Sequence, residues 1–483
     1  MITIDFSKRG KMGLCEFIYN TLKSQILSGQ LAPDSKLPSK RSLAVNLGVS
    51  IITVQNAYAQ LISEGYIYSI EKKGFFVTDI SLYTNKIADS RLVKTEQNEA
   101  ARKNSRNLAI SEKKNGNGNF FADFTSNTTS AEKFPFTLWS HTLRQILASG
   151  DQKLLQSSGV KGAVELRQAI SDYLRDFRDM NVNPEQIVVG AGSEYLYSIL
   201  VQFLGRDNVF AVENPGFKRT KEIFELNGAK CVPLEIDEQG MNPELLFKAG
   251  ANVAHISPNH HFPTGIVMPV RRRMELLSWC DESKSHFIIE DDYDSEFRFN
   301  GKPLPTLQSL SDESQIIYMN TFSKTLSPSF RIGYMVLPVS LQKSFESKMR
   351  SCSCPVSAFE QFTLARFMRE GFYEKHINRM RNYYRAVRNN LILEMHKSGL
   401  MDFCEIQEEE AGLHFLLKVK SEKSGEELKK SLAEQGIRIA LLSDFFYDNK
   451  GDKSEPVFVI NYSALKKENL SETVKRMKKA IAG

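Results

Sequence analysis

The chain has 483 residues, of which 41% are hydrophobic and 25% are charged. This composition is typical of a globular protein, and the length predicts two or three domains. No apolar run approaches the ~18 residues that cross a bilayer, and the N-terminus lacks the apolar core of a secretory signal. The sequence therefore predicts a soluble, cytoplasmic protein with no membrane partner.

The net charge of +6 is unevenly distributed along the chain. Residues 1–119 contain 17 lysines and arginines against 10 aspartates and glutamates, so this part carries +7 and the remainder is nearly neutral. A polyanion would bind at the basic end. The six cysteines show no CxxC pair or metal-ligand spacing, so we interpret them as reduced thiols and expect no metal site.

Composition divides the chain into three parts. Residues 81–119 are rich in Asn, Lys and Ser and end in Asn-Gly-Asn-Gly-Asn, which predicts a linker between a head, residues 1–80, and a body, residues 120–483. In the body, short β-type runs at 186–190, 208–213, 286–292 and 315–321 alternate with amphipathic stretches at 161–178 and 360–395. This alternation predicts an α/β fold with a mostly parallel sheet.

The head carries the pattern of a winged helix-turn-helix. Ser39 can cap a first helix, Gly48 is suited to end it, and Ser50 can cap a second helix with apolar residues at 54, 57, 58, 61 and 62. Two β-rich runs around the basic turn 71–74 then predict a hairpin. A small three-helix packing unit is the alternative interpretation.

On a winged scaffold the second helix lies in the major groove of double-stranded DNA, while flanking groups meet the phosphates. We therefore expect Thr53 and Gln55 to affect sequence preference and the basic side chains to position the head on the backbone. The candidate DNA-binding residues are Ser39, Lys40, Arg41, Ser50, Thr53, Gln55, Lys72 and Lys73.

The head resembles the GntR-type winged helix, whose residue pattern it matches at fixed offsets. The pattern runs Pro-Ser-x-Arg, Leu-Ala, Val-Ser-x-x-Thr-Val and Leu-x-x-x-Gly. The matching residues are Pro38, Ser39, Arg41, Leu43, Ala44, Val49, Ser50, Thr53, Val54, Leu61 and Gly65. One position departs from it, because Ile51 stands where this family usually has arginine.

In the body, Lys324 lies in the stretch NTFSKTLSPSFRIGY, among hydroxyl side chains. A lone lysine is usually a solvated surface charge. Its surroundings suggest Schiff-base chemistry with pyridoxal 5'-phosphate, which needs a phosphate cradle, a carboxylate for the pyridine nitrogen and a ring-stacking partner. The sequence offers a candidate for each of these at the end of a predicted strand.

For the phosphate, VVGAGSEYLYSIL runs from a strand through Gly190, Gly192 and Ser193 into a helix, whose N-terminus favours anions. Thr321, Ser323 and Arg331 add hydroxyls and a cation. An ordinary strand-to-helix turn is the alternative interpretation of this glycine motif.

For the ring, FIIEDDYDSEF places Asp291 and Tyr293 directly after a buried strand. An ionised Asp291 would keep the pyridine nitrogen protonated, and Tyr293 could reach the phenolic oxygen. Phe217 in VENPGFKRT is the stacking candidate. The alternatives are a solvated or Mg²⁺-binding acidic cluster and a core phenylalanine.

Together these motifs resemble the fold type I aminotransferases over roughly residues 120–483. The resemblance implies that Lys324 forms the Schiff base, Asp291 and Tyr293 contact the ring, and Phe217 stacks on it. It also implies that Gly192, Ser193, Thr321 and Arg331 line the phosphate. Phe262 departs from the pattern, because aminotransferases usually carry asparagine there. His260 is a possible substitute for its hydrogen bond, and a structural histidine is the alternative.

A GntR-like head, a polar linker and an aminotransferase-like body in this order resemble the MocR family of transcription regulators, especially its GabR-type members. The resemblance implies a domain-swapped homodimer that binds operator DNA and senses an amino-acid or amine effector, with Arg219 and Arg438 as candidates to hold the effector carboxylate. The alternatives are a working aminotransferase that carries a DNA-binding head, and a metal or phosphate-ester enzyme using the Asp291 region.

Overall fold

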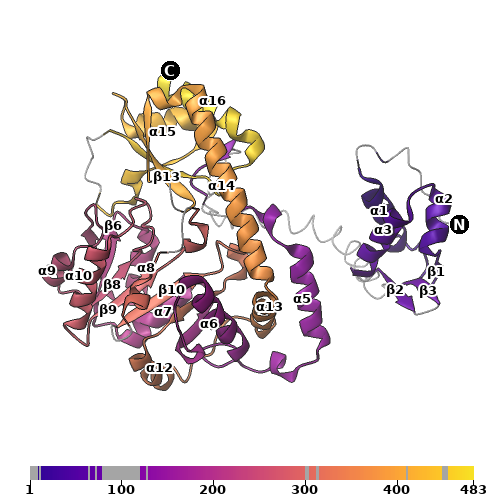
Figure 1. Cartoon of the computed structure of the whole chain (residues 1–483), viewed down its shortest axis with the longest axis horizontal. Coiled ribbons are helices and arrows are strands. Elements are labelled where there is room, and N and C mark those ends of the chain that lie inside the picture. The colour runs from indigo at the N-terminus through magenta and orange to yellow at the C-terminus, as the bar shows by residue number, and fades with distance from the viewer. Residues whose placement is uncertain are drawn as a thin grey trace, which may run out of the picture. The chain divides into compact units, whose positions relative to one another are not determined.

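The computed structural model describes residues 9, 12–63, 66–70, 73–78, 120–126, 129–299, 304–311, 315–408, 412–448 and 455–483. The chain divides into two compact units, Met1–Gly116 and Asn117–Gly483 (Figure 1). The predicted linker, residues 81–119, lies outside the described residues. Among the helices in the described ranges, none has both the length and the apolar character needed to span a bilayer.

The N-terminal unit packs three helices against a small antiparallel sheet. Its helices are α1 Leu14–Leu27, α2 Lys40–Leu47 and α3 Ile51–Ser63, and its strands β1 Lys36–Leu37, β2 Ile67–Ile70 and β3 Gly74–Val77 pair in the order β1-β3-β2. The predicted helix-turn-helix (α2 and α3) and hairpin (β2 and β3) are confirmed, whereas α1 and β1 were not predicted.

Local capping explains where α2 and α3 begin. The Ser39 hydroxyl accepts a hydrogen bond from the Ser42 backbone N–H at 3.1 Å, and Gly48 ends α2 with φ 64°, a conformation that suits glycine. The Ser50 hydroxyl accepts from the Thr53 N–H at 3.1 Å. The expected apolar face of α3 is buried at Val54, Ala57, Tyr58 and Leu61, whereas Ile62 is 36% exposed.

The C-terminal unit is built on a seven-stranded sheet in the order β5-β11-β10-β9-β8-β6-β7. Only β11 runs antiparallel to its neighbours, which confirms the predicted mostly parallel α/β fold. The strands are β5 Ile187–Gly190, β6 Val209–Asn214, β7 Lys230–Glu235, β8 Val253–Ile256, β9 Phe287–Asp291, β10 Ile316–Thr321 and β11 Gly333–Val336.

Helices cover both faces of this sheet (Figure 1). Adjacent residues Val188 and Val189 of β5 belong to different core clusters, one with α7 and one with α6 and α13, as expected when successive side chains alternate between faces. The helices are α5 Phe136–Ala148, α6 Val164–Arg178, α7 Ser193–Leu204, α8 Lys218–Leu226, α9 Pro243–Ala249, α10 Val270–Asp281, α11 Leu307–Leu310, α12 Gln342–Lys348 and α13 Ala358–Arg369.

A second layer near the C-terminus was not predicted from the sequence. It is a four-stranded antiparallel sheet in the order β12-β13-β16-β15, packed with α14 Phe372–Ser398, α15 Gly425–Glu434 and α16 Leu470–Ala482. Its strands are β12 Cys404–Gln407, β13 His414–Val419, β15 Ala440–Leu441 and β16 Val457–Asn461. Nearby, β4 Ala122–Asp123 pairs in parallel with β14 Ile437–Arg438, which ties the start of the unit to its end.

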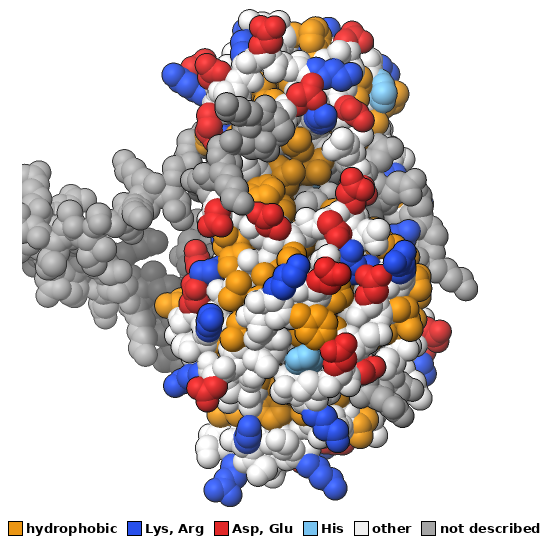
Figure 2. Space-filling view, turned by 90° about the vertical axis from the view of Figure 1, so that its left-hand side faces the viewer, with side chains coloured by type: hydrophobic (Ala, Val, Ile, Leu, Met, Phe, Trp, Pro, Cys, Tyr) orange, Lys and Arg blue, Asp and Glu red, His pale blue; other side chains and the backbone are white. Residues whose placement is uncertain are grey.

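One predicted helix is two. The amphipathic stretch 360–395 is divided between α13 and α14, because Gly371 has φ 71° and starts a new helix direction. On the face shown in Figure 2, acidic and basic side chains are interspersed among apolar ones, in keeping with the nearly neutral charge of residues 120–483.

Candidate cofactor and effector site

The candidate site lies where several strands of the large sheet end. The loops that follow β5, β6, β8, β9 and β10 meet around a cavity of about 350 Å³. Ligands in open α/β sheets bind at this carboxyl edge. The cavity brings together nine of the residues that the sequence predicted: Ser193, Phe217, Arg219, Asp291, Tyr293, Thr321, Ser323, Lys324 and Arg331.

One end of the cavity has the composition of a phosphate cradle. Ser193 is the first residue of α7, so backbone N–H groups and its hydroxyl lie at the positive end of that helix. Gly192 has φ 83°, and a Cβ on it would lie 3.1 Å from Cζ of Arg331, so the close approach of this guanidinium requires glycine. Thr321 and Ser323 line the same cavity.

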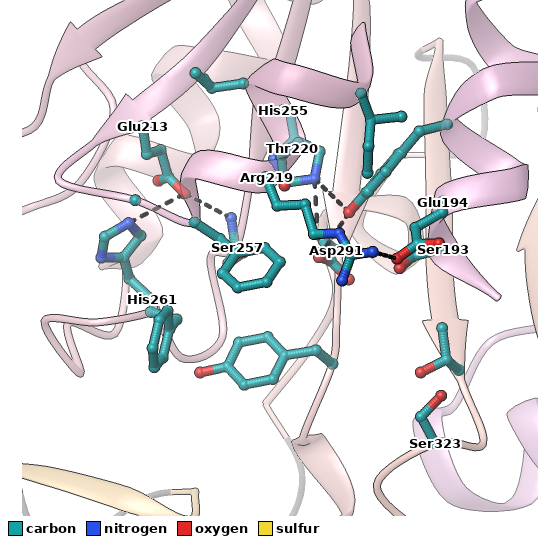
Figure 3. A pocket seen from close by; sticks show the side chains of 18 of the residues that line it. Ser193, Glu194, Glu213, Arg219, Thr220, His255, Ser257, His261, Asp291 and Ser323 are labelled. Atoms are coloured by element: carbon teal, nitrogen blue, oxygen red, sulfur yellow. Dashed lines mark hydrogen bonds and ion pairs between the residues drawn. The ribbon is translucent and has the colours of Figure 1, made fainter. Parts of the chain in front are cut away.

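A carboxylate links the two arginines of the cavity. Glu194 Oε1 lies 2.5 Å from Nη2 of Arg219 (Figure 3). Its Oε2 lies 3.1 Å from Nη2 of Arg331. All three side chains are partly exposed to solvent, so each ion pair contributes modestly. The sequence reasoning did not identify Glu194, although it directly follows Ser193.

Asp291 belongs to a hydrogen-bonded chain of three residues that all line the cavity. The Tyr197 hydroxyl donates to Asp291 Oδ2 at 3.0 Å and lies 2.9 Å from Nε2 of His255. Burial raises the pKa of Asp291 to about 7, and the bond from Tyr197 opposes this. Burial lowers the pKa of His255 to about 4, so a neutral His255 can donate to Tyr197 and orient its hydroxyl towards Asp291.

Lys324 is 8% exposed and lines the cavity just after β10. Burial lowers the pKa of its amine to about 8, and the charge of Asp294 opposes that shift. A larger fraction of this amine is therefore uncharged near neutral pH than for an ordinary lysine, which is what a nucleophilic amine needs.

The opposite wall of the cavity is aromatic and carries a buried acid. The Phe217 and Phe262 rings meet edge to face with centroids 6.3 Å apart, and Phe217 is 53% exposed. Glu213 accepts a hydrogen bond from the Ser257 N–H at 3.0 Å and lies 3.5 Å from Nε2 of His261. Burial raises the pKa of Glu213 to about 8, so this acid is largely protonated at neutral pH.

Three residues predicted for the site, Gly192, His260 and Arg438, do not line the cavity, although Gly192 directly precedes Ser193 at the start of α7. Arg438, expected to hold the effector carboxylate, lies in β14 with an exposed side chain 3.6 Å from Asp123 Oδ2 and does not line the cavity. The Asp123 carboxylate therefore lies within ion-pair distance of the Arg438 guanidinium. His260 is buried behind the cavity wall, where its Nδ1 lies 3.1 Å from the Tyr293 hydroxyl, so it reaches the site only through Tyr293.

Two known families match separate parts of the chain. Residues 14–77 match the family of bacterial regulatory proteins of the gntR type, and residues 122–477 match aminotransferase class I and II. The HTH-type transcriptional regulator YdeL of Bacillus subtilis is 34% identical over 97% of this chain and 96% of its own length. The probable rhizopine catabolism regulatory protein MocR of Rhizobium meliloti is 29% identical, over 96% and 93%.

The chain belongs to the MocR/GabR-like family of transcription regulators.

Solved structures support the fold assignment of the body. The kynurenine aminotransferase of Pyrococcus horikoshii, solved in complex with PMP, superposes with a TM-score of 0.64 at 22% identity and covers 74% of this chain and 90% of that chain. The aminotransferase domain of this MocR/GabR-like chain indicates pyridoxal phosphate as its cofactor.

Among the predicted DNA-binding residues of this regulator, two serines act as helix caps. Ser39 and Ser50 accept the backbone N–H groups that begin α2 and α3. The Thr53 hydroxyl lies 2.8 Å from the Ser50 hydroxyl, so it takes part in the same cap.

The remaining side chains of this set lie on the surface of the head. Arg41, Gln55 and Lys73 are exposed, and Lys40 is half-buried with Nζ 5.3 Å from the centre of the Phe75 ring. Lys72 lies outside the described residues. Ile51 and Ile52 are 46% and 70% exposed on the first turn of α3, where family members usually present arginine at the first of the two positions.

The cavity residues that sequence reasoning missed include the titratable groups Glu194, Tyr197, Glu213, His255, His261 and Tyr447. Tyr197 carried a usable signal, since it follows Ser193 by four residues and so lies on the same face of α7. His255 comes from β8, and its meeting with Tyr197 depends on how α7 packs on the sheet, which no local spacing predicts.

Proposed function

We propose that the chain is a transcription regulator that binds operator DNA through its winged head and senses an amino-acid or amine effector through pyridoxal phosphate held on Lys324. One observation carries the proposal. A GntR-type winged helix and a cavity lined by the buried Lys324, the Asp291 carboxylate, hydroxyl side chains and Arg331 occur in one chain.

The residues of the cavity fit the cofactor. Ser193, Thr321, Ser323 and Arg331 would hold the phosphate, and Gly192 leaves the space in which the Arg331 guanidinium lies. Bound pyridoxal phosphate supplies an aldehyde that captures amines and a ring that withdraws electrons.

The chain's own groups adjust that chemistry. Lys324 would form the covalent bond, because burial leaves its amine partly uncharged. Asp291, oriented by Tyr197, would hold a proton on the pyridine nitrogen, and this ion pair would in turn favour its ionised form. Tyr293 would meet the phenolic oxygen, and Phe217 would cover the ring.

Effector recognition is assigned to Arg219. It lines the cavity together with Phe217, and among the described lining residues the other arginine is Arg331, which the phosphate would occupy. Arg219 therefore offers one carboxylate-binding guanidinium, and Lys324 offers the bond that an effector amine would exchange with. An effector with both groups, or an amine alone, suits this arrangement.

The head would contact DNA with α3 in the major groove. The exposed side chains of Arg41 and Lys73 would meet phosphates, as the sequence predicts for Lys72 also, while Gln55 would read base edges. We further propose a homodimer in which the linker, residues 81–119, lets the head of one subunit reach the body of the other, so that two heads read two half-sites.

The test measures operator affinity and amino-group transfer in one preparation, across a panel of amino acids and amines. A ligand-dependent change in operator affinity with slow or absent turnover supports the regulator. The second candidate is a working aminotransferase, which the retention of Lys324, Asp291 and Tyr293 in one cavity favours. Rapid repeated turnover without any change in operator binding would establish that alternative.

A further inference from the structure

A buried polar cluster lies directly behind the cavity wall. His260 and Asp294 are 4% and 3% exposed, and Nδ1 of His260 lies 2.9 Å and 3.2 Å from the two carboxylate oxygens of Asp294. The Tyr293 hydroxyl lies 3.1 Å from the same Nδ1. Tyr293 also lines the cavity, so it connects this cluster to the site.

The geometry decides which atom carries each hydrogen. An ionised carboxylate only accepts hydrogen bonds, so Nδ1 of His260 must carry the hydrogen that points at Asp294. Because that nitrogen is then a donor, the Tyr293 oxygen beside it can only accept from it. The hydroxyl hydrogen of Tyr293 is then not needed for the bond to His260 and can be donated on the cavity side.

The opposite ring nitrogen agrees with this tautomer. Nε2 of His260 is buried and has no hydrogen-bond partner among the described residues. A buried N–H without an acceptor is rare in proteins, whereas a bare lone pair is tolerated more often. The hydrogen on His260 therefore belongs on Nδ1.

We propose that His260 and Asp294 are positioning residues that turn the Tyr293 hydroxyl into a fixed hydrogen-bond donor towards the cavity. The inference rests on the proposed function, in which Tyr293 faces the phenolic oxygen of pyridoxal phosphate. The pair thereby compensates for Phe262, whose side chain has no donor at the position where aminotransferases usually carry asparagine.

The cluster is held in place from the second sheet. Gly412 lies just before β13, and a Cβ on it would overlap both the His260 ring and the Asp294 carboxylate. His414 packs on His260 with ring centroids 4.5 Å apart. The other titratable or charged groups facing the cluster are Lys324, Asp291, Asp292, Glu213, His261, Arg178 and Arg298.

The test is the pH at which the visible absorption band of the cofactor-loaded protein changes, measured for single and double variants. In His260→Ala, the Tyr293 hydroxyl would turn inwards and donate to Asp294. The phenolic oxygen of the cofactor would then lose the hydrogen bond that stabilises its negative charge, so the midpoint should rise by about one to two pH units.

Three comparisons separate positioning from a merely structural role. Tyr293→Phe should raise the midpoint by a similar amount, and His260→Ala should add little in the Tyr293→Phe background, because both changes remove one hydrogen bond. His260→Asn should stay near the original midpoint, since the two amide hydrogens of asparagine can serve both Asp294 and Tyr293. Equal shifts for His260→Asn and His260→Ala, or an additive double variant, would overturn the proposal.

A second readout does not need the cofactor. Nitrogen NMR of histidine-labelled, cofactor-free protein should show His260 protonated at Nδ1, assigned by the signal that disappears in His260→Asn. Protonation at Nε2 instead of Nδ1 would contradict the positioning role. An absent visible band in the original protein would sink the proposed function instead, while the NMR result would still judge the His260–Asp294 pair.

Discussion

At the scale of single residues, the site is built from ordinary side chains whose properties are changed by burial. Lys324 is the clearest case, because this residue is 8% exposed just after β10 and burial lowers the pKa of its amine to about 8. An exposed lysine has the same atoms but remains protonated at neutral pH. The reactivity expected of Lys324 therefore comes from its place in the fold.

The first prediction concerns the covalent bond. Lys324→Ala should abolish the borohydride-reducible adduct with pyridoxal phosphate, because it removes the amine that forms the bond. Intact-protein mass spectrometry after reduction measures the adduct, and circular dichroism checks the fold. The exposed Lys248 on α9 provides the matched control, since Lys248→Ala should leave the adduct unchanged. A stoichiometric adduct in Lys324→Ala would show that another lysine holds the cofactor.

The second prediction concerns pH. Only the uncharged amine attacks the aldehyde, so the rate at which cofactor-free protein gains visible absorbance should rise with pH and level off above about 8. An unperturbed lysine would keep gaining rate up to about pH 10. Stopped-flow mixing with pyridoxal phosphate across this range measures the profile. A rate still climbing steeply above pH 9 would contradict the lowered pKa of Lys324.

The third prediction concerns Arg219 and its ion-pair partner Glu194. Arg219→Ala should weaken a carboxylate-bearing effector by about 10- to 100-fold, because it removes a charge-assisted pair, while cofactor binding is kept. Glu194→Gln should strengthen the same effector a few-fold, since it releases Arg219 from an internal ion pair. Titration of the visible band with amino acids, and with the corresponding amines that lack a carboxylate, measures both effects. An equal loss for amines and amino acids in Arg219→Ala would exclude the carboxylate role.

At the scale of elements, local sequence signals specify helices α2 and α3 of the head, and the two faces of α3 have different roles. The caps at Ser39 and Ser50 begin α2 and α3, and the buried face of α3 packs on the core of the head. The opposite face presents exposed Gln55, Ile51 and Ile52. Apolar side chains at the start of a recognition helix suit contact with thymine methyl groups.

The fourth prediction compares these faces. Arg41→Ala should weaken binding to all DNA sequences and reduce the slope of log affinity against log salt by about 0.9 for one lost phosphate contact. Gln55→Ala should leave that slope unchanged and alter sequence preference, because it removes a base-edge contact. Salt-dependent binding to operator and random duplexes measures both. A changed salt slope for Gln55→Ala would assign that residue to the backbone instead.

At the scale of the whole molecule, an effector in the C-terminal unit can regulate DNA binding only if the two units are energetically coupled. An effector can shift the arrangement of the heads only when it binds one arrangement better than another. The fifth prediction is therefore reciprocal: the effector should bind free and operator-bound protein with different affinities, and operator affinity should change by the same factor when effector is added. Identical effector affinities in both states would mean that the cavity does not regulate DNA binding.

The sequence alone determined the local parts of this protein. Capping serines, the helical spacing of Val54, Tyr58 and Leu61, and the alternation of strands and helices predicted the winged head and the parallel sheet, because these signals act within a few residues. Motifs at strand ends placed Lys324, Asp291 and Ser193 in one cavity, because parallel strands end at a common edge.

The tertiary structure decided everything that depends on contacts between distant segments. The chain from Tyr197 to His255 and Asp291, the pairing of Glu194 with two arginines, and the His260–Asp294 cluster each join different elements across a packed interface. Arg438 was predicted for the effector site without knowledge of such contacts, and in the structure its strand pairs with β4 near the start of the unit. Spacing along the chain predicts neighbours on one helix or strand edge, whereas side-chain packing selects the partners between them.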